Sequence, residues 1–207
     1  PDPAGQGGHA MNNEWMFRVA LVVGLLTLLS VGLPHRLRAR TGERLDRRQE
    51  GLVPAITLRL VGLGYWLGLL CYIIRPEWMA WGAVPLTAAV RWMGAPLLVT
   101  AICLAGWTLR HLGPNLTDTV VTRQRHTLIT SGPYRFIRHP FYASAALFFP
   151  ANALLAANVF LLVIGVTAFG LLINRTRREE ANLLARFGDE YRRYQKRTGR
   201  ILPRFTR

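Results

Sequence analysis

A stretch near the middle of the chain gathers charged, aromatic and turn-forming side chains between two apolar runs. From His126 to Tyr142 it reads HTLITSGPYRFIRHPFY, with two histidines, two arginines, two tyrosines and a Gly-Pro turn. Arginine can hold an anionic group, and histidine can serve as a general base. Because a membrane span needs none of these side chains, the stretch predicts a functional site.

A second polar cluster follows the last apolar run. Arg175, Glu179 and Leu183 recur every four residues, so the first two share a helix face, and Glu180 follows directly. A lone Arg/Glu pair at this spacing is usually a solvated ion pair. The pair is expected on the same membrane face as the first stretch, which favours one shared site.

The composition indicates a membrane protein. The 207 residues are 51% hydrophobic yet carry a formal net charge of +15, so apolar and basic residues are segregated into blocks. The arginines flank apolar runs and form no separate basic domain, which favours membrane lipids over nucleic acid as partners. The sequence has no Cys-x-x-Cys or His-Glu-x-x-His spacing, and we expect no metal site.

We expect an all-α integral membrane protein with about five transmembrane helices. The apolar runs are Trp15–Leu33, Leu52–Ile74, Trp92–Leu109 and Phe141–Ile173. At about 1.5 Å per residue each of the first three can cross the hydrocarbon core, and the last is about twice as long as a minimal span. Pro150, Asn152 and Asn158 interrupt this last run, which predicts a hairpin that turns within residues 150–158 and supplies spans four and five.

The segments outside these runs complete the predicted organisation. Residues 1–10 precede Met11 and are Gly/Pro-rich, so we expect a tag or disordered tail there. Residues 11–109 then hold spans one to three, and residues 110–207 hold both polar clusters. Arg75–Arg91, with its tryptophans, is typical of an interfacial segment. An amphipathic helix is expected to reach Phe187, followed by an interruption at Gly188 and a short second helix.

Arginine-rich segments set the predicted topology. They are His35–Glu50, Arg110–Arg138 and Asn174–Arg207, and the positive-inside rule places all three in the cytoplasm, with the N-terminus outside. The functional site is therefore expected on the cytoplasmic side of a plasma membrane, or of the inner membrane in a prokaryote. Gly64 and Gly68 lie four residues apart, which predicts close helix packing and offers a face for oligomerisation.

The order of these motifs resembles that of the isoprenylcysteine carboxyl methyltransferase family, whose nearest relatives are the phospholipid N-methyltransferases. The resemblance covers about Leu112 to Pro203. The motifs are Gly132-Pro133-Tyr134, Arg138-His139-Pro140-Phe141-Tyr142, an apolar hairpin, Arg175-x-x-x-Glu179-Glu180, Phe187-Gly188-x-Glu190-Tyr191 and a closing Leu202-Pro203. The first hundred residues resemble the family only in that they also form membrane spans.

The resemblance implies an integral-membrane methyltransferase that uses S-adenosyl-L-methionine and releases S-adenosyl-L-homocysteine, with residues 110–207 as its catalytic region. By the family pattern the catalytic residues are Arg138, Arg175 and Glu179. The residues implied in cofactor binding are His126, Leu128, Gly132, Tyr134, His139, Pro140, Tyr142 and Glu180. The acceptor is expected to be lipophilic and to enter from the bilayer.

Several alternatives remain open at this point. The methyl acceptor can be a prenylcysteine-like carboxylate, an amine or phospholipid head, or a thiol. Membrane sterol reductases, which use NADPH, also resemble this region through an Arg-His motif before a hairpin. The adjacent Glu179 and Glu180 favour the methyltransferase reading. A membrane scaffold without activity would leave the charged residues on both sides of the hairpin unexplained.

Overall fold

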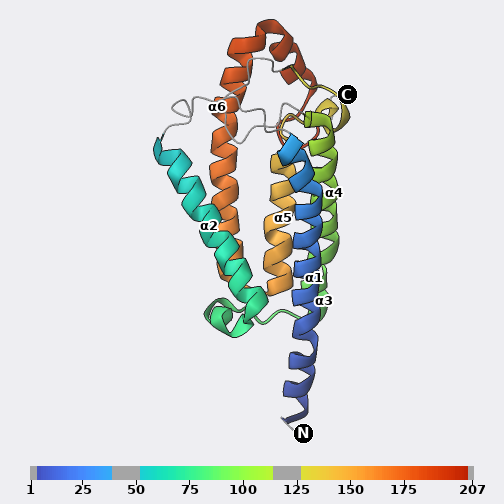
Figure 1. The fold of residues 1–207 in the computed structure, drawn as a ribbon, viewed down its shortest axis with the longest axis vertical. Coiled ribbons are helices and arrows are strands. Elements are labelled where there is room, and N and C mark those ends of the chain that lie inside the picture. Colours follow the sequence, from blue (N-terminus) through green and yellow to red (C-terminus); the bar gives the residue numbers. More distant parts are fainter. Residues whose placement is uncertain (1–3, 39–51, 114–126, 205–207) are drawn as a thin grey trace.

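In a computed structural model the chain forms a bundle of long helices (Figure 1). The structure describes residues 4–38, 52–113 and 127–204. The long helices are α1 (Ala4–Arg38), α2 (Leu52–Ile74), α4 (Gly94–Leu112), α5 (Pro140–Ala156) and α6 (Val159–Arg197). Shorter elements are α3 (Ala88–Trp92) and the 3-10 helices η2 (Pro76–Gly82) and η4 (Gly132–Arg135). The all-α expectation is confirmed, since the described residues hold two isolated β-bridges and no longer strand.

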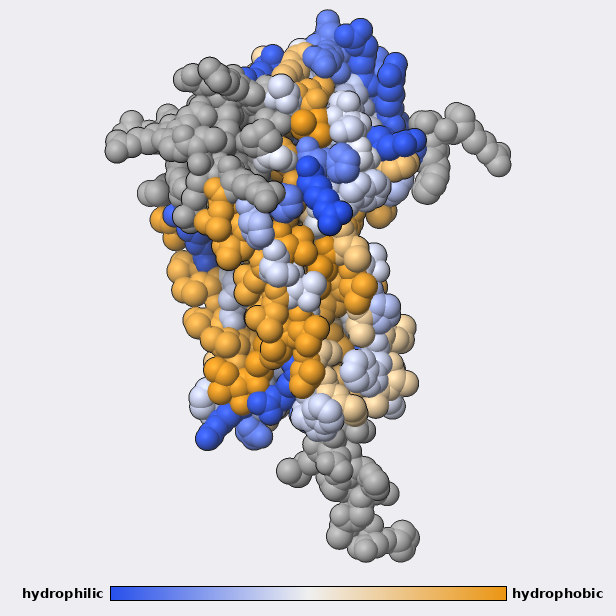
Figure 2. Space-filling model, turned by 45° about the vertical axis from the view of Figure 1, so that its right-hand side comes forward, coloured by the Kyte–Doolittle hydropathy of each residue, from blue (hydrophilic) through white to orange (hydrophobic). Residues whose placement is uncertain are grey.

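The helices have the lengths and compositions of an integral membrane protein. In the described part of the chain, four segments are long and apolar enough to cross a membrane: Glu14–His35, Val53–Ile74, Ala88–Leu112 and Val159–Arg197. Helix α5 is also apolar but has only 17 residues. Figure 2 shows the resulting apolar belt between hydrophilic ends. The expected spans are therefore present, with the fourth shorter than a standard crossing.

One boundary differs from the sequence expectations, and the hairpin turn falls inside its expected range. Helix α1 begins at Ala4, inside the expected tail, because extending an existing helix needs no new nucleation. Pro150 lies inside α5, and the hairpin turns at Ala157 and Asn158, at the end of the expected range 150–158. Ala157 adopts a left-handed conformation there, and the Asn158 side chain caps α6 by accepting from the Leu161 amide at 3.3 Å. These two residues stop and restart the helix, whereas Pro150 removes only one hydrogen bond.

Gly64 and Gly68 pack against α6 of the same chain. A β-carbon at Gly68 would lie 2.6 Å from the Phe160 ring, and one at Gly64 would lie 2.9 Å from the Ile164 side chain. The expected close packing is confirmed, since only glycine permits this approach. The expected oligomer face has no support, because α6 of the same chain covers both glycines.

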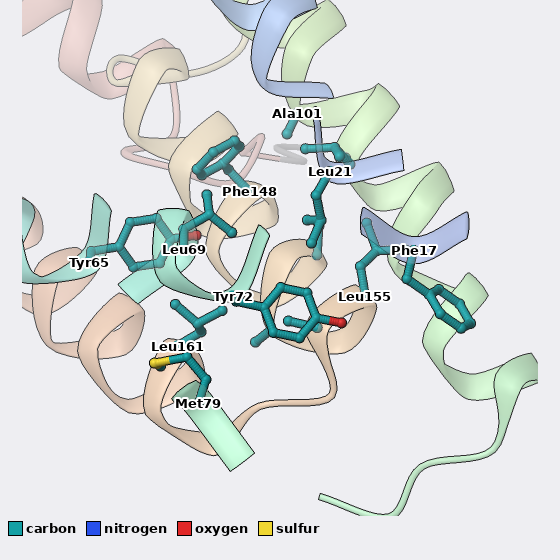
Figure 3. Close-up of a cluster of buried hydrophobic side chains, with 14 of the residues drawn as sticks. Phe17, Leu21, Tyr65, Leu69, Tyr72, Met79, Ala101, Phe148, Leu155 and Leu161 are labelled. Atoms are coloured by element: carbon teal, nitrogen blue, oxygen red, sulfur yellow. The ribbon is translucent and has the colours of Figure 1, made fainter. Parts of the chain in front are cut away.

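A buried core joins α1, α2, α5 and α6 away from the chain's C-terminal segment (Figure 3). Phe17 and Leu21 of α1 meet Leu69 of α2, and Leu155 and Leu161 come from the two sides of the hairpin turn. Each of these side chains is fully or almost fully buried. We call this end of the bundle the far end, and the end that carries residues 127–139 and the C-terminal segment the loop end.

Arg91 organises a polar network at the far end, which we call the far-end clasp (Glu14, Tyr72 and Arg91). Its guanidinium donates to both carboxylate oxygens of Glu14 at 2.7 and 3.0 Å, to the Tyr72 hydroxyl at 2.8 Å, and to the Leu155 carbonyl at 2.8 and 3.1 Å. The Tyr72 hydroxyl donates to Glu14 in turn. The clasp therefore ties α1, α2, α3 and α5 together, which the interfacial reading of Arg75–Arg91 did not anticipate.

Helices α1 and α2 are joined at the far end and separate toward the loop end (Figure 1). Arg18 of α1 donates to the carbonyls of Ile73 and Ile74 at 2.7 and 2.8 Å, and so caps the end of α2. At the loop end, the facing sides of the two helices line a cavity instead of packing together.

Candidate active site

A cavity of about 690 Å³ runs from the loop end into the apolar belt. Its apolar arm is lined by leucine, glycine and aromatic side chains from α1, α2, α4, α5 and α6. Its polar end is lined by Tyr134, Arg138, His139, Tyr142, Arg175, Glu179, Tyr191 and Tyr194. One continuous space thus joins a group of ionisable side chains to a hydrophobic passage.

Glu179 is the centre of one hydrogen-bonded group at the polar end. Its Oε1 accepts from the Tyr142 hydroxyl at 2.5 Å and from Arg175 Nε at 3.2 Å. Its Oε2 lies 3.5 Å from Nδ1 of His139, whose ring stacks on Tyr142. The expected Arg175/Glu179 helix pair is present and its side chains are about 20% exposed, so it is not a solvated ion pair.

Glu180 is the centre of a second group, beyond the apolar part of α6. Its Oε1 accepts from Arg138 Nε at 2.8 Å and lies 3.1 Å from Nε2 of His139, and its Oε2 accepts from Gln195 at 3.4 Å. Burial alone would raise the pKa of Glu180, but the hydrogen bonds from His139 and Arg138 outweigh it and lower the pKa to about 2. The carboxylate is therefore charged at neutral pH, and His139 bridges the two glutamates.

The C-terminal segment holds the first polar stretch in place. The backbone amides of Arg138 and His139 donate to the carbonyls of Gly199 and Arg200 at 2.8 and 3.0 Å. The Arg138 side chain also donates to the Thr198 carbonyl. Arg200 contacts Thr176 of α6 through its guanidinium. Residues 60 and 61 positions apart are thereby fixed against each other around Glu180.

Gly188 and Gly132 supply the two backbone turns that this arrangement needs. Gly188 has a φ of 51°, and α6 bends there, as expected, so that its final segment returns over the site. Gly132 has a φ of 59°, and a β-carbon there would lie 2.4 Å from the His111 ring. It starts η4, which carries Tyr134; burial raises the pKa of this phenol and keeps it neutral.

The structure brings most of the expected site residues together. Arg138, His139, Tyr142, Arg175, Glu179 and Glu180 form the two hydrogen-bonded groups, and Leu128, Tyr134 and Pro140 line the same cavity. Gly132 serves as the turn before Tyr134 and is not part of the cavity wall. His126 lies outside the described residues.

Sequence reasoning did not single out Tyr191, Tyr194 and Arg200 as site residues. Tyr191 and Tyr194 line the cavity, and the Tyr194 hydroxyl donates to the Tyr134 carbonyl at 2.7 Å. The available sequence signal was a pair of tyrosines three residues apart within a basic segment. Arg200 had no such sequence signal, because its position at the site depends on the backbone hydrogen bond between its carbonyl and the His139 amide. Among the described residues, no group of three His, Cys, Asp or Glu side chains is placed to hold a metal ion.

Residues 93–185 match the family model described as the isoprenylcysteine carboxyl methyltransferase family. Rat protein-S-isoprenylcysteine O-methyltransferase is 31% identical over 120 residues, which are 55% of this chain and 42% of the relative. Methanethiol S-methyltransferase of Mycobacterium tuberculosis is 36% identical over 70 residues, which are 34% of this chain and 28% of that protein. The chain therefore matches less than half the length of these two relatives.

A solved structure described as the eukaryotic intramembrane Ras methyltransferase shares the fold. Its TM-score is 0.54 at 20% sequence identity, and the match covers 70% of this chain and 51% of that one. The region that matches the family model, residues 93–185, contains the hairpin and the Arg175/Glu179/Glu180 cluster, with the His139 motif before them. Over this region and in the order of its motifs, the chain is similar to the isoprenylcysteine carboxyl methyltransferase family, and it shares the fold of the solved structure.

Proposed function

We propose that the chain is an integral-membrane methyltransferase that uses S-adenosyl-L-methionine and methylates the polar head of a lipophilic acceptor. The observation that carries the proposal is the shape of the cavity, in which a polar end lined by Arg138, Arg175 and Glu179 continues into an apolar arm between spans. The match of residues 93–185 to the methyltransferase family model supports methyl transfer, and the relatives' names make a prenylcysteine-like carboxylate the leading acceptor class.

The side chains at the polar end suit the groups of this cofactor, which is a zwitterionic amino acid joined to a sulfonium and an adenosine. Arg138 offers a cation for the carboxylate, and Glu180 is an acceptor held charged by its neighbours. The half-buried Tyr134 offers an aromatic surface. We assign Leu128, His139 and Pro140 to the same subsite, and we place His126 and Gly132 beside it through the family pattern.

When bound, the cofactor supplies an electrophilic methyl group on sulfur. The residues of the chain then need to align the acceptor with that methyl and to exclude water, because in-line displacement depends mainly on these two effects. Arg175 would hold an anionic acceptor head through its guanidinium. Glu179, fixed by Tyr142 at 2.5 Å, would orient that guanidinium.

The need for a general base depends on the acceptor. A carboxylate is already ionised at neutral pH and can attack directly. A thiol or an amine has to lose a proton, and His139 is the candidate base because its ring lies between Glu179 and Glu180. The similarity to a protein named methanethiol S-methyltransferase keeps a thiol as the second acceptor class.

The acceptor tail would occupy the apolar arm and enter from the bilayer between α1 and α2. Leu25, Leu29 and Gly32 of α1 face Leu58 and Gly62 of α2 across this arm. These side chains form no polar barrier to a hydrocarbon chain, so lipid and acceptor compete for the same passage.

S-adenosyl-L-homocysteine is expected to raise the melting temperature of the purified protein. A ligand that binds only the folded state adds about 2.7 kcal/mol of stability at about 100 times its dissociation constant. Thermal melts in one detergent would compare this ligand with NADPH, and adenosine would serve as the control. A shift with NADPH and none with S-adenosyl-L-homocysteine would support the sterol reductase alternative instead.

We also propose that the loop end faces the cytoplasm, since the arginine-rich segments follow the positive-inside rule. Single cysteines at the exposed positions Arg193 and Glu77 would test this in a background with Cys71 and Cys103 replaced by alanine. An impermeant thiol reagent added to intact cells is expected to label only the cysteine at position 77. Labelling of position 193 from outside would invert the proposed topology.

A further inference from the structure

Tyr191 is a buried phenol in the cavity wall whose hydroxyl has no partner. Its side chain is 1% exposed, and it lines the polar end of the cavity. Its hydroxyl makes no hydrogen bond to any residue that the structure describes. Buried hydroxyls in native proteins are almost always paired, because an unpaired one loses its hydration without compensation.

Tyr194 provides the contrast within the same helical segment. It lies three residues later, its ring centroid is 5.9 Å from that of Tyr191, and it is also buried. Its hydroxyl donates to the Tyr134 carbonyl at 2.7 Å. The protein thus provides a hydrogen-bond partner for the Tyr194 hydroxyl and none for the Tyr191 hydroxyl among the described residues. Because the two tyrosines are neighbours in one segment, the packing of that segment does not explain this difference.

The helical segment of Tyr191 lies on the Glu180 side of the site, because Gln195, one helical turn further on, donates to Glu180 at 3.4 Å and accepts from Arg138 at its carbonyl at 3.2 Å. Burial raises the pKa of its phenol, and the charge of Glu180 raises it further, so the group is a neutral donor at physiological pH. Arg138, which holds Glu180, is the next charge that acts on it. The Tyr142 hydroxyl, in contrast, already donates a hydrogen bond to Glu179. The unpaired donor therefore belongs to the part of the cavity that we assign to the cofactor.

We infer that the Tyr191 hydroxyl donates a hydrogen bond to S-adenosyl-L-methionine and acquires its partner only when the cofactor is bound. The inference rests on the proposed function, because it takes this cofactor to be the ligand of the Glu180 side. Tyr191 binds and orients the ligand through a polar acceptor atom, and it exchanges no proton. The bend at Gly188 is what brings the phenol over the site.

Tyr191→Phe and Tyr194→Phe form a matched pair for the test. Calorimetric titration with S-adenosyl-L-homocysteine in detergent would give the dissociation constant of each full-length variant, and melts without ligand would give its stability. Tyr191→Phe is expected to bind about three- to tenfold more weakly, the range of one neutral hydrogen bond, and to melt at or above the wild-type temperature. Tyr194→Phe is expected to melt lower without ligand, because it loses the bond to Tyr134.

Each other outcome overturns the inference. Unchanged binding by Tyr191→Phe would show that the hydroxyl does not serve the cofactor, even if the Michaelis constant for the acceptor rises. A melting temperature lowered as far as that of Tyr194→Phe would show that the protein itself provides a partner. Absence of binding by the wild-type protein would instead overturn the proposed function.

Discussion

Replacing Arg175 by lysine is expected to remove most methyl transfer while the fold survives. Lysine keeps the positive charge but lacks the planar fork that can hold a carboxylate with two parallel hydrogen bonds. The Nε contact with Glu179 at 3.2 Å is lost as well. Because a misplacement of about 1 Å at a reacting centre can cost about 100-fold in rate, we expect a loss of that order.

The assay would follow a labelled methyl group into a lipid-soluble acceptor, with a thermal melt for every variant. Arg177→Lys is the matched control, since Arg177 is exposed two residues further along the same helix. The double variant Arg175→Ala/Glu179→Ala should be no worse than the more damaging single change, because the two residues act as a unit. Near-normal turnover in Arg175→Lys, or strictly additive losses, would contradict the proposed role of the pair.

Replacing Arg91 by methionine is expected to cause the largest loss of stability. The Arg91 side chain is 12% exposed, and it neutralises Glu14 at 2.7 Å. It also donates a hydrogen bond to the Leu155 carbonyl near the end of α5, and its guanidinium lies 3.7 Å from the centre of the Phe17 ring. Methionine would leave the partly buried Glu14 carboxylate without its counter-charge and the buried Leu155 carbonyl without a donor, which costs about 3 kcal/mol or more.

Reversible unfolding in mixed micelles would measure this loss. Arg75→Met is the control at the same end, because Arg75 is exposed and contacts only the face of Trp78 among the described side chains; we expect a change within about 0.5 kcal/mol. Adding Glu14→Gln to Arg91→Met should recover part of the loss by removing the unpaired charge. An Arg91→Met protein as stable as Arg75→Met would show that the far-end clasp contributes nothing.

Local sequence patterns were sufficient for the elements and for part of the site. The apolar runs predicted the spans because hydrophobic length is a local property, and the four-residue spacing of Arg175 and Glu179 placed both on one helix face. The interruption at Gly188 was also predictable, since glycine readily adopts its positive φ. The proposed Arg175/Glu179 function remains a prediction.

Contacts between distant segments could not be predicted in this way. Arg91 and Glu14 are 77 residues apart, and the charge of Arg91 alone suggested only an interfacial position. Gly64 and Gly68 showed that a partner helix packs there, but not that it is α6. The turn after α5 lies within its predicted range, residues 150–158, but its position inside that range was not predictable, because the left-handed Ala157 and the capping Asn158 carry weaker sequence signals than proline.

Helix α6 runs without interruption from Val159, after the hairpin turn, to Phe187, before the bend at Gly188, and it therefore fixes the height of Glu179. Asn158, at its start, donates to the Met79 carbonyl at 2.9 Å, and Glu179 lies 21 residues later, a rise of about 32 Å. That distance is close to the thickness of a hydrocarbon core of about 30 Å. The protein thus places the Glu179 carboxylate near the boundary of the hydrocarbon core. The depth of a lipid acceptor's head, in contrast, is set by the bilayer. Under the proposed function, hydrophobic mismatch is therefore expected to affect turnover, because lipids of different chain length would move the acceptor head relative to a glutamate of fixed height.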